Sequence, residues 1–335
     1  MKYACLVPAV LCTAVLAVCS CVSGGSDVAE RILGVSQPPV FLSAKAVSQT
    51  QVQFRFSKPV TVSSLSFSPQ LEAEITEDGS TVNVDFGGGL EPGERVTADL
   101  LATDESGNTI NVLVPFRARN DRVPSLRITE LRTDYTRPRS EFIEMRTFAA
   151  GNLGALRVFI ASNHRSPVVY EFPPVEVRSG EYVTLHLRKV EDANRDELGS
   201  DLGASGGVNA SPTGRDIWVP GTVKLLRRTD IVYILDQDDE VVDAVVLSEN
   251  PGLTWDRSHF ADAADFLFLA GAWKSRDETG ISPTDAVQTA GTTTTRTINR
   301  DETLAENSRS AGDWYITVTS GATPGRVNNP RRHGS

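Results

Sequence analysis

Two short acidic stretches carry the oxygen ligands that a hard cation requires. Asp192, Asn194 and Asp196 stand at alternate positions, as in the first half of a calcium-binding loop. The second half departs from that pattern, because Glu197 stands where the sharp turn needs glycine and Gly203 where a glutamate should close the shell. The alternative is a solvated acidic loop, and the sequence favours it.

The second acidic stretch lies between two apolar segments. Asp236, Asp238 and Asp239 cluster there, with Asp243 a few residues further on. Aspartates at a hairpin tip commonly cap neighbouring backbone amides, and we expect that role for these side chains. A calcium ion bridging the tip is the alternative. No metal or cofactor is therefore expected, and calcium is the alternative that the two acidic stretches leave open.

The histidines do not have the spacing of a catalytic or metal-binding motif. None of His164, His186, His259 and His333 belongs to a His-x-Glu or His-x₃-His pattern, and the chain lacks a Gly-x-Ser-x-Gly elbow and a phosphate-binding glycine loop. His186 falls in an alternating segment, where a packed or surface histidine is expected. We therefore predict that the protein is not an enzyme. A triad of residues distant in sequence stays open as an alternative.

All four cysteines lie in the first 21 residues, at Cys5, Cys12, Cys19 and Cys21. Lys2 provides a small positive region, and an apolar run follows at residues 6–18. That run is shorter than the ~20 apolar residues of a transmembrane helix, and a short apolar run after a positive residue is typical of an export signal.

The segment Leu16–Cys21 resembles the lipobox of bacterial lipoproteins, in which a cysteine after a small residue is acylated. Cys21 follows Ser20, whereas Cys19 would follow the branched Val18, so Cys21 is the predicted lipidation site and Cys19 the alternative. The resemblance implies a signal peptide at 1–20, a lipidated, flexible tether at 21–30, and a place in the cell envelope. The missing acidic residue after Cys21 favours the outer membrane over the inner one. A conventional secretory signal is the other interpretation.

Composition limits the remaining possibilities. The chain of 335 residues has a formal net charge of −10 and 40% hydrophobic residues. An acidic chain lacks the positive field that non-specific nucleic-acid binding needs, so nucleic acid is an unlikely partner. The hydrophobic content predicts folded structure, and the length predicts two domains.

Residues 31–119 alternate apolar and polar side chains in short segments. Val52, Phe54 and Phe56 share one face of such a segment, and residues 82–86 repeat the pattern. Alternation of this kind, with turn signals between segments, predicts a small antiparallel sandwich. The segments Phe56–Val60, Leu90–Val96 and Asp104–Asn108 resemble those of bacterial immunoglobulin-like domains, which implies a spacer or a binding platform.

Residues 124–329 resemble the lamin-tail domain, an immunoglobulin-like sandwich. Leu126–Arg132 and Glu141–Arg146 are similar to its first strands, and Val177–Leu185 to a later turn and strand. At the other end, Asp313-Trp314 and Thr323–Asn328 are similar to its closing motifs, the second of which contains Thr-Pro-Gly. The expected fold class is therefore all-β, with two immunoglobulin-like sandwiches in tandem.

Two insertions, near 190–222 and 249–291, are not part of the lamin-tail pattern. We expect them to form the binding surface, with Trp218, Trp255 and Trp273 as candidate contact residues. The apolar residues between Phe260 and Trp273 are expected to pack as core rather than form an exposed patch. Residues 330–335 are expected to be a disordered tail.

These features predict a non-enzymatic, lipid-anchored envelope protein that presents a lamin-tail-like domain to a protein or glycan, in adhesion or as a scaffold. One alternative is an accessory subunit of an exported nuclease or phosphoesterase, because lamin-tail domains resemble modules that accompany such enzymes. A weaker alternative is a hydrolase with its site in the insertions. The sequence does not identify the ligand.

Overall fold

The computed structural model describes residues 37–304 and 307–334, and the predicted signal peptide, Cys19, Cys21 and most of the tether lie outside them. The chain divides into two compact units. Of the described residues, the first holds 37–47, 51–87 and 96–116. The second holds residues 117–334 with the short segments 48–50 and 88–95.

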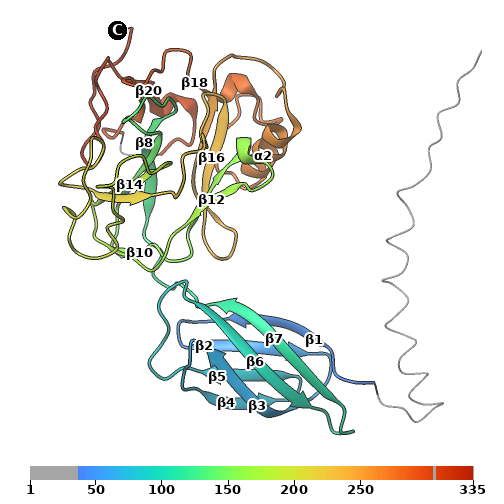
Figure 1. Cartoon of the computed structure of the whole chain (residues 1–335). Coiled ribbons are helices and arrows are strands. Elements are labelled where there is room, and N and C mark those ends of the chain that lie inside the picture. Colours follow the sequence, from blue (N-terminus) through green and yellow to red (C-terminus); the bar gives the residue numbers. More distant parts are fainter. Residues whose placement is uncertain (1–36, 305–306, 335) are drawn as a thin grey trace, which may run out of the picture. The chain divides into compact units, whose positions relative to one another are not determined.

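The first unit is built from two antiparallel sheets (Figure 1). The four-stranded sheet has the order β1-β2-β5-β4 and the three-stranded sheet the order β3-β6-β7. The strands are β1 (Phe41–Ala46), β2 (Gln51–Phe56), β3 (Thr61–Ser68), β4 (Glu74–Asp78), β5 (Thr81–Asp85), β6 (Arg95–Thr103) and β7 (Thr109–Arg117).

The alternation in the sequence explains this pairing. Val52, Phe54 and Phe56 on β2 are buried, as are Val82 and Val84 on β5, while the residues between them are more exposed. β2 pairs with β5 so that Phe54 lies opposite Val82 and Val52 opposite Val84. One face of the sheet is thereby apolar, which fixes the strand register.

The second unit contains a six-stranded sheet, a five-stranded sheet and a two-stranded ribbon. The six-stranded order is β15-β14-β9-β8-β19-β20, with β8 (Leu126–Arg132), β9 (Phe142–Thr147), β14 (Tyr182–His186), β15 (Arg215–Trp218), β19 (Ile298–Arg300) and β20 (Trp314–Ile316). The five-stranded order is β12-β11-β16-β17-β18, with β11 (Arg157–Ile160), β12 (Val168–Glu171), β16 (Asp230–Leu235), β17 (Val241–Ser248) and β18 (Val287–Gln288). The ribbon pairs β10 (Gly151–Asn152) with β13 (Glu176–Val177).

Most neighbouring strands are antiparallel, and both parallel pairs of the second unit involve a strand from an insertion. β15 joins β14 in parallel, and β18 joins β17 in parallel. The first insertion thus extends one sheet and the second insertion extends the other. The fold of the described chain is all-β and sandwich-like, as the sequence predicted.

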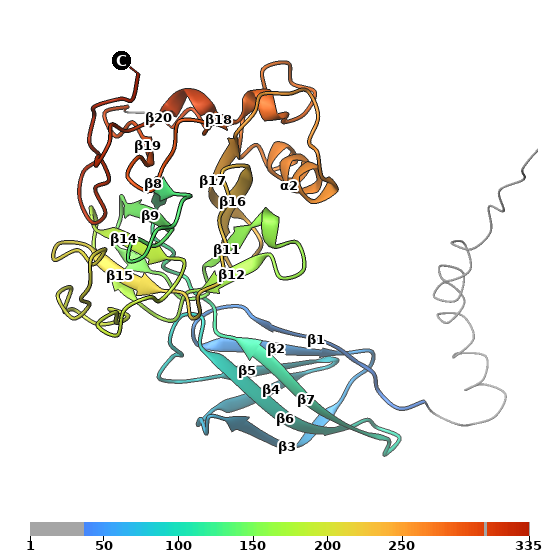
Figure 2. The same ribbon diagram turned by 45° about the horizontal axis from the view of Figure 1, so that its top comes forward.

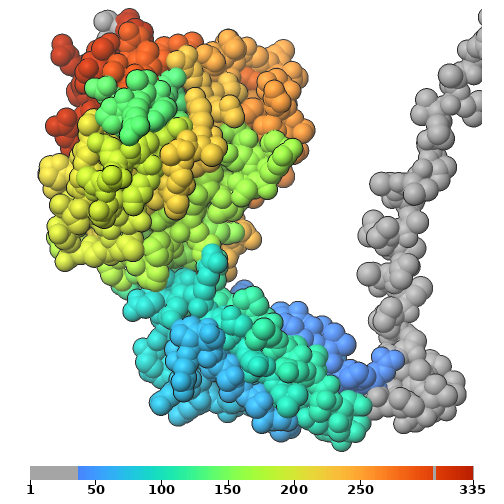
Figure 3. All heavy atoms as spheres, in the orientation of Figure 1, coloured from blue at the N-terminus to red at the C-terminus, as the bar shows by residue number. Residues whose placement is uncertain are grey.

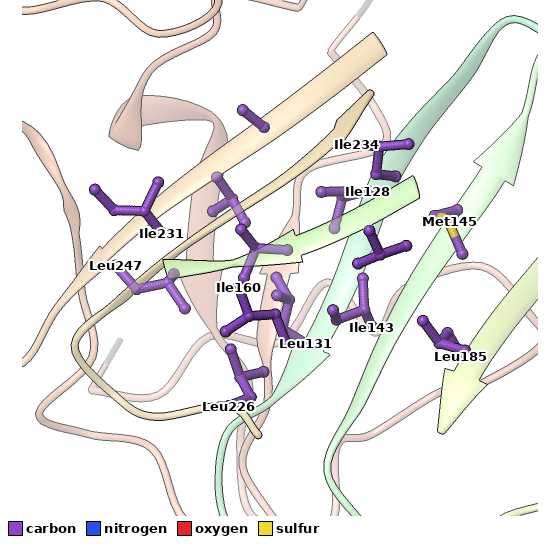
Figure 4. Close-up of a cluster of buried hydrophobic side chains, with 14 of the residues drawn as sticks. Ile128, Leu131, Ile143, Met145, Ile160, Leu185, Leu226, Ile231, Ile234 and Leu247 are labelled. Atoms are coloured by element: carbon purple, nitrogen blue, oxygen red, sulfur yellow. The ribbon is translucent and has the colours of Figure 1, made fainter. Parts of the chain in front are cut away.

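The core of the second unit lies between its two large sheets (Figure 4). Ile128, Ile143 and Leu185 project from the six-stranded sheet towards Ile160 and Ile234 of the five-stranded sheet. All five are fully buried. Each such side chain contributes about 1.5–3 kcal/mol through burial, so this interface stabilises the positions of the loops that leave the strands.

The second insertion also supplies the helix of this unit, α2 (Ser258–Leu269), which lies beside β16 and β17 (Figures 1 and 2). Phe260 and Leu267 on α2 and Trp273 after it are buried in the core, whereas Leu269 is exposed. The prediction that the segment Phe260–Trp273 packs as core is correct for these three side chains. Short 3-10 helices occur at η1 (Ala161–Asn163), η2 (Pro283–Asp285) and η3 (Ala311–Asp313).

The prediction of a disordered tail at 330–335 is wrong for residues 331–333. Thr317 and Arg332 form an antiparallel bridge, the backbone of Val318 donates to Arg331, and His333 donates to Ile316. These bonds join the C-terminal segment to β20, and Figure 3 shows that segment in red at the surface of the second unit. Across the described residues no helix is long and apolar enough to cross a membrane.

Candidate functional site

A cleft of about 650 Å³ lies in the second unit, where loops far apart in the sequence meet. We call it the arginine cleft. Its lining contains Arg132, Arg139 and Arg326, together with side chains from residues 208–213, 294–295 and 320–324. Residues 208–213 belong to the first insertion, so part of the segment expected to form a binding surface does line a cavity.

Two buried carboxylates hold one wall of the cleft in place. Glu130 on β8 accepts hydrogen bonds from the backbone N–H of Thr323 at 3.0 Å and from its hydroxyl at 3.1 Å. Glu144 on β9 accepts one from the backbone N–H of Gly325 at 2.5 Å. The Thr323–Gly325 loop is therefore fixed to the first two strands of the domain. The segments that carry the lamin-tail resemblance at the two ends meet at this point.

The environment of these carboxylates changes their protonation. Burial raises the pKa of Glu130 to about 7, against the opposing effect of the hydrogen bonds from Thr297 and Thr323. Burial and the negative charge of Glu130 both raise the pKa of Glu144 well above its ordinary value. Two adjacent carboxylates in one dry site disfavour double ionisation, so the pair holds a proton more strongly than exposed glutamates do.

Close backbone packing fixes the same loop from the other side. A Cβ atom on Gly325 would lie 2.0 Å from the Ser211 hydroxyl oxygen, and one on Gly214 would lie 2.4 Å from the Gly325 Cα. Gly325 also has a φ of +79°, in the left-handed region. Glycine at both positions lets the C-terminal loop contact the first insertion directly.

Arg132 ends β8 and is held rigidly at the cleft. Its guanidinium lies 4.8 Å from the centre of the Phe142 ring, and its Nη1 donates to the side-chain oxygen of Asn209 at 2.8 Å and to the carbonyl of Ser140. The residue is 5% exposed. Burial lowers the pKa of Arg132 to about 10. Attraction to Glu130 and Glu141 opposes this shift and repulsion from Arg139 adds to it, and the side chain stays charged at neutral pH.

The cleft is positively charged in an otherwise acidic protein. Arg139 and Arg326 are exposed, and within residues 37–304 and 307–334 neither they nor Arg132 forms an ion pair. No aspartate or glutamate is among the described residues that line the cleft. Guanidinium groups in a cavity whose lining contains no carboxylate attract anions and can bind them in a bidentate manner.

A Ser-His-Asp arrangement occurs elsewhere in the same unit, but it is fully buried. His186 Nε2 lies 2.7 Å from Asp216, and its Nδ1 lies 3.5 Å from the Ser140 hydroxyl. The His186 ring also stacks on Trp218 at 3.8 Å. All three polar side chains are inaccessible to solvent, so a substrate cannot reach the hydroxyl. Burial lowers the pKa of His186, and the arrangement acts as a polar core network.

The acidic hairpin tip is held by protein contacts. The Asp236 side chain accepts hydrogen bonds from the backbone N–H groups of Asp238 and Glu240, and Asp239 pairs with Arg157 at 2.6 Å. This is the capping arrangement expected of a hairpin tip, and β16 and β17 are the two strands it joins.

The candidate ligands in the first insertion point to separate partners. Asn194 accepts from the backbone N–H of Glu191, and Asp196 accepts from that of Trp218 at 2.7 Å. Asp192 is exposed. Neither acidic stretch forms a group of three metal-ligating side chains among the described residues.

The prediction that tryptophans of the insertions are contact residues of a binding surface is wrong for Trp218 and Trp273. Trp218 and Trp273 are each 2% exposed. Trp218 is covered by the His186 ring and Trp273 belongs to the core. Trp255 is partly buried against that core and donates to the carbonyl of Ile281 at 2.8 Å. Large aromatic side chains in the insertions gain more from burial than from exposure, so the insertions fold back on the sandwich.

A second cavity, of about 640 Å³, is lined by residues of the second insertion and of the segment before β16, together with Asp134, Ser162 and His164. Its basic side chains are partly offset by acids: Arg228 bridges Asp134 at 3.1 Å and Glu249 at 3.0 Å. His164 and His259 stack with ring centres 4.9 Å apart at this cavity. Because its charges are partly paired internally, this cavity is a weaker candidate for an anionic ligand.

Sequence reasoning missed Arg132 and Arg139. Arg132 ends β8 and Arg139 lies in the loop that follows, and neither has the spacing of a ligand-binding motif. The available signal was the absence of an acidic residue near the Thr-Pro-Gly loop and in residues 207–213. That signal has meaning only once these segments are known to be neighbours.

The second unit is thus a β-sandwich-like domain with a preformed cationic cleft. Residues 124–316 match the family described as TP_1001_2nd, "protein second domain", and the chain belongs to this family. A Treponema pallidum (strain Nichols) protein described as "Uncharacterized protein" is 28% identical over 199 residues, which are 56% of this chain and 49% of the relative. The chain therefore spans about half the length of that relative.

Among solved structures, the N-terminal part of the bacterial S-layer protein SbsC aligns with 63% of this chain and 44% of its own, at 15% identity and a TM-score of 0.23. We draw no inference from a similarity of this size.

Proposed function

We propose that this protein is a non-enzymatic envelope protein that binds a protein or glycan in the arginine cleft of its second domain. The observation that carries the proposal is the cleft itself, with three arginines that form no ion pair among the described residues and a wall fixed by buried hydrogen bonds. Preformed cavities with a few convergent polar groups are the usual ligand sites of folded domains.

The second domain is proposed to be lamin-tail-like and the first immunoglobulin-like. The support for the former is that the two ends of the resemblance lie together, because Thr323 and Gly325 bond to Glu130 and Glu144. A rigid sandwich that presents variable loops suits recognition. The buried Ser140 hydroxyl offers no accessible nucleophile, which favours binding over hydrolysis.

The chain is proposed to be attached to the outer membrane through a lipid on Cys21, with Cys19 as the alternative site. This part rests on the sequence of residues 16–21 alone. A single acyl chain binds membranes reversibly, and two or three chains give a lasting anchor. Attachment would keep the second domain close to the surface polymers and proteins of the envelope.

Charge reversal tests the binding role. The full chain and an Arg139→Glu/Arg326→Glu variant would each be immobilised and exposed to envelope fractions that have been treated with protease, with glycan-degrading enzymes, or with neither. Both residues are exposed, so the variant should fold. We expect the wild-type protein to capture either proteins or glycans from these fractions, and the variant to lose capture of that class of molecule. Equal capture by the two proteins would exclude the cleft as the binding site.

A further inference from the structure

Resting on the proposed binding function, we infer that the ligand of the arginine cleft is an acidic carbohydrate, a sugar that carries a carboxylate or a phosphate. Arg132, Arg139 and Arg326 would bind the anionic group, and the hydroxyl side chains of the cleft would bind the sugar hydroxyls. Three independent features of the cleft support this class of ligand.

The first feature is unbalanced charge. Arg132 and Arg139 both line the cleft and repel each other, and no acidic residue of the described lining lies between them. Glu130 and Glu141, which do not line the cleft, offset only part of this positive charge. Bringing two guanidinium groups together costs free energy, and an anion bound between them in the cleft recovers part of it. The formal charge of −10 makes this local excess of positive charge a specific feature rather than a general one.

The second feature is preorganisation of Arg132. The Phe142 ring, the Asn209 side chain and the Ser140 carbonyl hold the guanidinium, while its Nε and Nη2 have no hydrogen-bond partner among the described residues. A planar donor group that is already ordered loses little conformational entropy when a carboxylate or phosphate binds. Arg132 is therefore suited to recognise an oxyanion.

The third feature is the hydroxyl content of the lining. Ser211, Thr213, Thr294, Thr295 and Ser320 all contribute to the cleft. Hydroxyl groups both donate and accept hydrogen bonds, as sugar hydroxyls do. The volume of about 650 Å³ lies within the range of small-molecule sites, about 300–1,000 Å³.

Other classes of anion fit less well. Among the described lining residues none is aromatic, so a single-stranded nucleic acid would lack a surface on which to stack its bases. The cleft is lined mainly by loops and not along an exposed strand, so an acidic peptide could not add as a further strand of a sheet.

Calorimetric titration of the full chain tests the inference with five probes. Digalacturonate and glucose 6-phosphate are the acidic sugars, and digalactose is the uncharged counterpart of digalacturonate. Inorganic phosphate and tetraglutamate are anions without a sugar. We expect one or both acidic sugars to bind, and the neutral disaccharide, inorganic phosphate and tetraglutamate to bind at least about tenfold more weakly. Arg139→Gln and Arg326→Gln should each weaken the acidic sugar by about tenfold, which is the loss of a charge-assisted contact. Lys224→Gln, which removes an exposed cation from the other cavity, is the matched control and should change nothing.

Several outcomes would overturn the inference. Inorganic phosphate binding as tightly as the sugars would mean that the sugar ring contributes nothing, and tighter binding of tetraglutamate would make the ligand a peptide. Failure of both acidic sugars to bind, or binding unaffected by Arg139→Gln and Arg326→Gln, would also exclude it. If capture from envelope fractions still depends on the cleft, only the carbohydrate inference fails. If capture is independent of the cleft, the proposed binding function fails as well.

Discussion

The side chain of Glu130 accepts two hydrogen bonds from Thr323, a residue 193 positions further along the chain. Neither residue is accessible enough to bind a ligand itself, because both are buried. Their contact instead fixes the loop that separates the carboxylate pair from the arginine cleft. Changes in the protonation or packing of this contact should therefore affect the stability of the second domain first and ligand binding second.

The stability of the second domain is expected to fall as the pH rises from about 4.5 to about 7. Because the pKa of Glu130 is raised from 4.5 to about 7 by burial, the folded state holds the proton more strongly, and its contribution is complete only below the unfolded pKa. Glu130→Gln should make this pH dependence shallower. Urea unfolding followed by tryptophan fluorescence measures it, since all four tryptophans lie in the second domain, at Trp218, Trp255, Trp273 and Trp314.

The control for that experiment is Glu240→Gln, which replaces an exposed carboxylate on the hairpin between β16 and β17. The control should keep the wild-type dependence on pH. If the free energy of unfolding depended on pH in the same way in Glu130→Gln and in the wild-type protein, Glu130 would have the same pKa in the folded and the unfolded state.

Gly325→Ala should destabilise the second domain more than Gly180→Ala. Both glycines have a positive φ, +79° and +84°, so both substitutions incur the same backbone strain of about 1–2 kcal/mol. A Cβ on Gly180 meets nothing within 4 Å, whereas one on Gly325 meets Ser211 at 2.0 Å, which adds about 1–3 kcal/mol of overpacking. The measurement is the free energy of unfolding of the two variants, and equal losses would mean that the close packing of Gly325 against Ser211 does not contribute.

Glu141→Gln should lower the free energy of unfolding by about 3–5 kcal/mol, because it leaves the buried Arg188 without its partner. Two hydrogen bonds of 2.6 Å join the two side chains, of which Arg188 is 7% exposed and Glu141 0% exposed. The comparison is Glu249→Gln, which breaks the pair between Glu249 and Arg228, where the side chains are 44% and 31% exposed. That change should cost less than about 1 kcal/mol. A similar loss in both variants would contradict the assignment of Arg188–Glu141 as a structural pair.

Metabolic labelling with a palmitate analogue should label the wild-type protein and not Cys21→Ala. Cys19→Ala is the matched control, since it removes a neighbouring thiol and leaves Ser20 and Cys21 unchanged. Label retained in Cys21→Ala and lost in Cys19→Ala would move the lipid to Cys19. Absence of label from the wild-type protein would favour the conventional secretory signal.

The sequence by itself determined the strands and the fold class, because period-two alternation such as that of Val52, Phe54 and Phe56 already specifies which face of a strand is buried. It also identified the β16–β17 hairpin and the apolar cluster between Phe260 and Trp273, but not the helix α2 that carries part of that cluster. These are local patterns, in which the relevant residues lie within one segment and a few positions of one another.

Only the tertiary structure decided where the insertions go and what they form. Burial of Trp218 depends on the His186 ring, and the cleft depends on Arg132, Ser211 and Pro324 coming together from three distant segments. The physical reason is that such contacts are set by the packing of whole sheets and by close approaches such as that of Gly325 to Gly214. A single sequence contains the side chains of the cleft but does not show that they are neighbours.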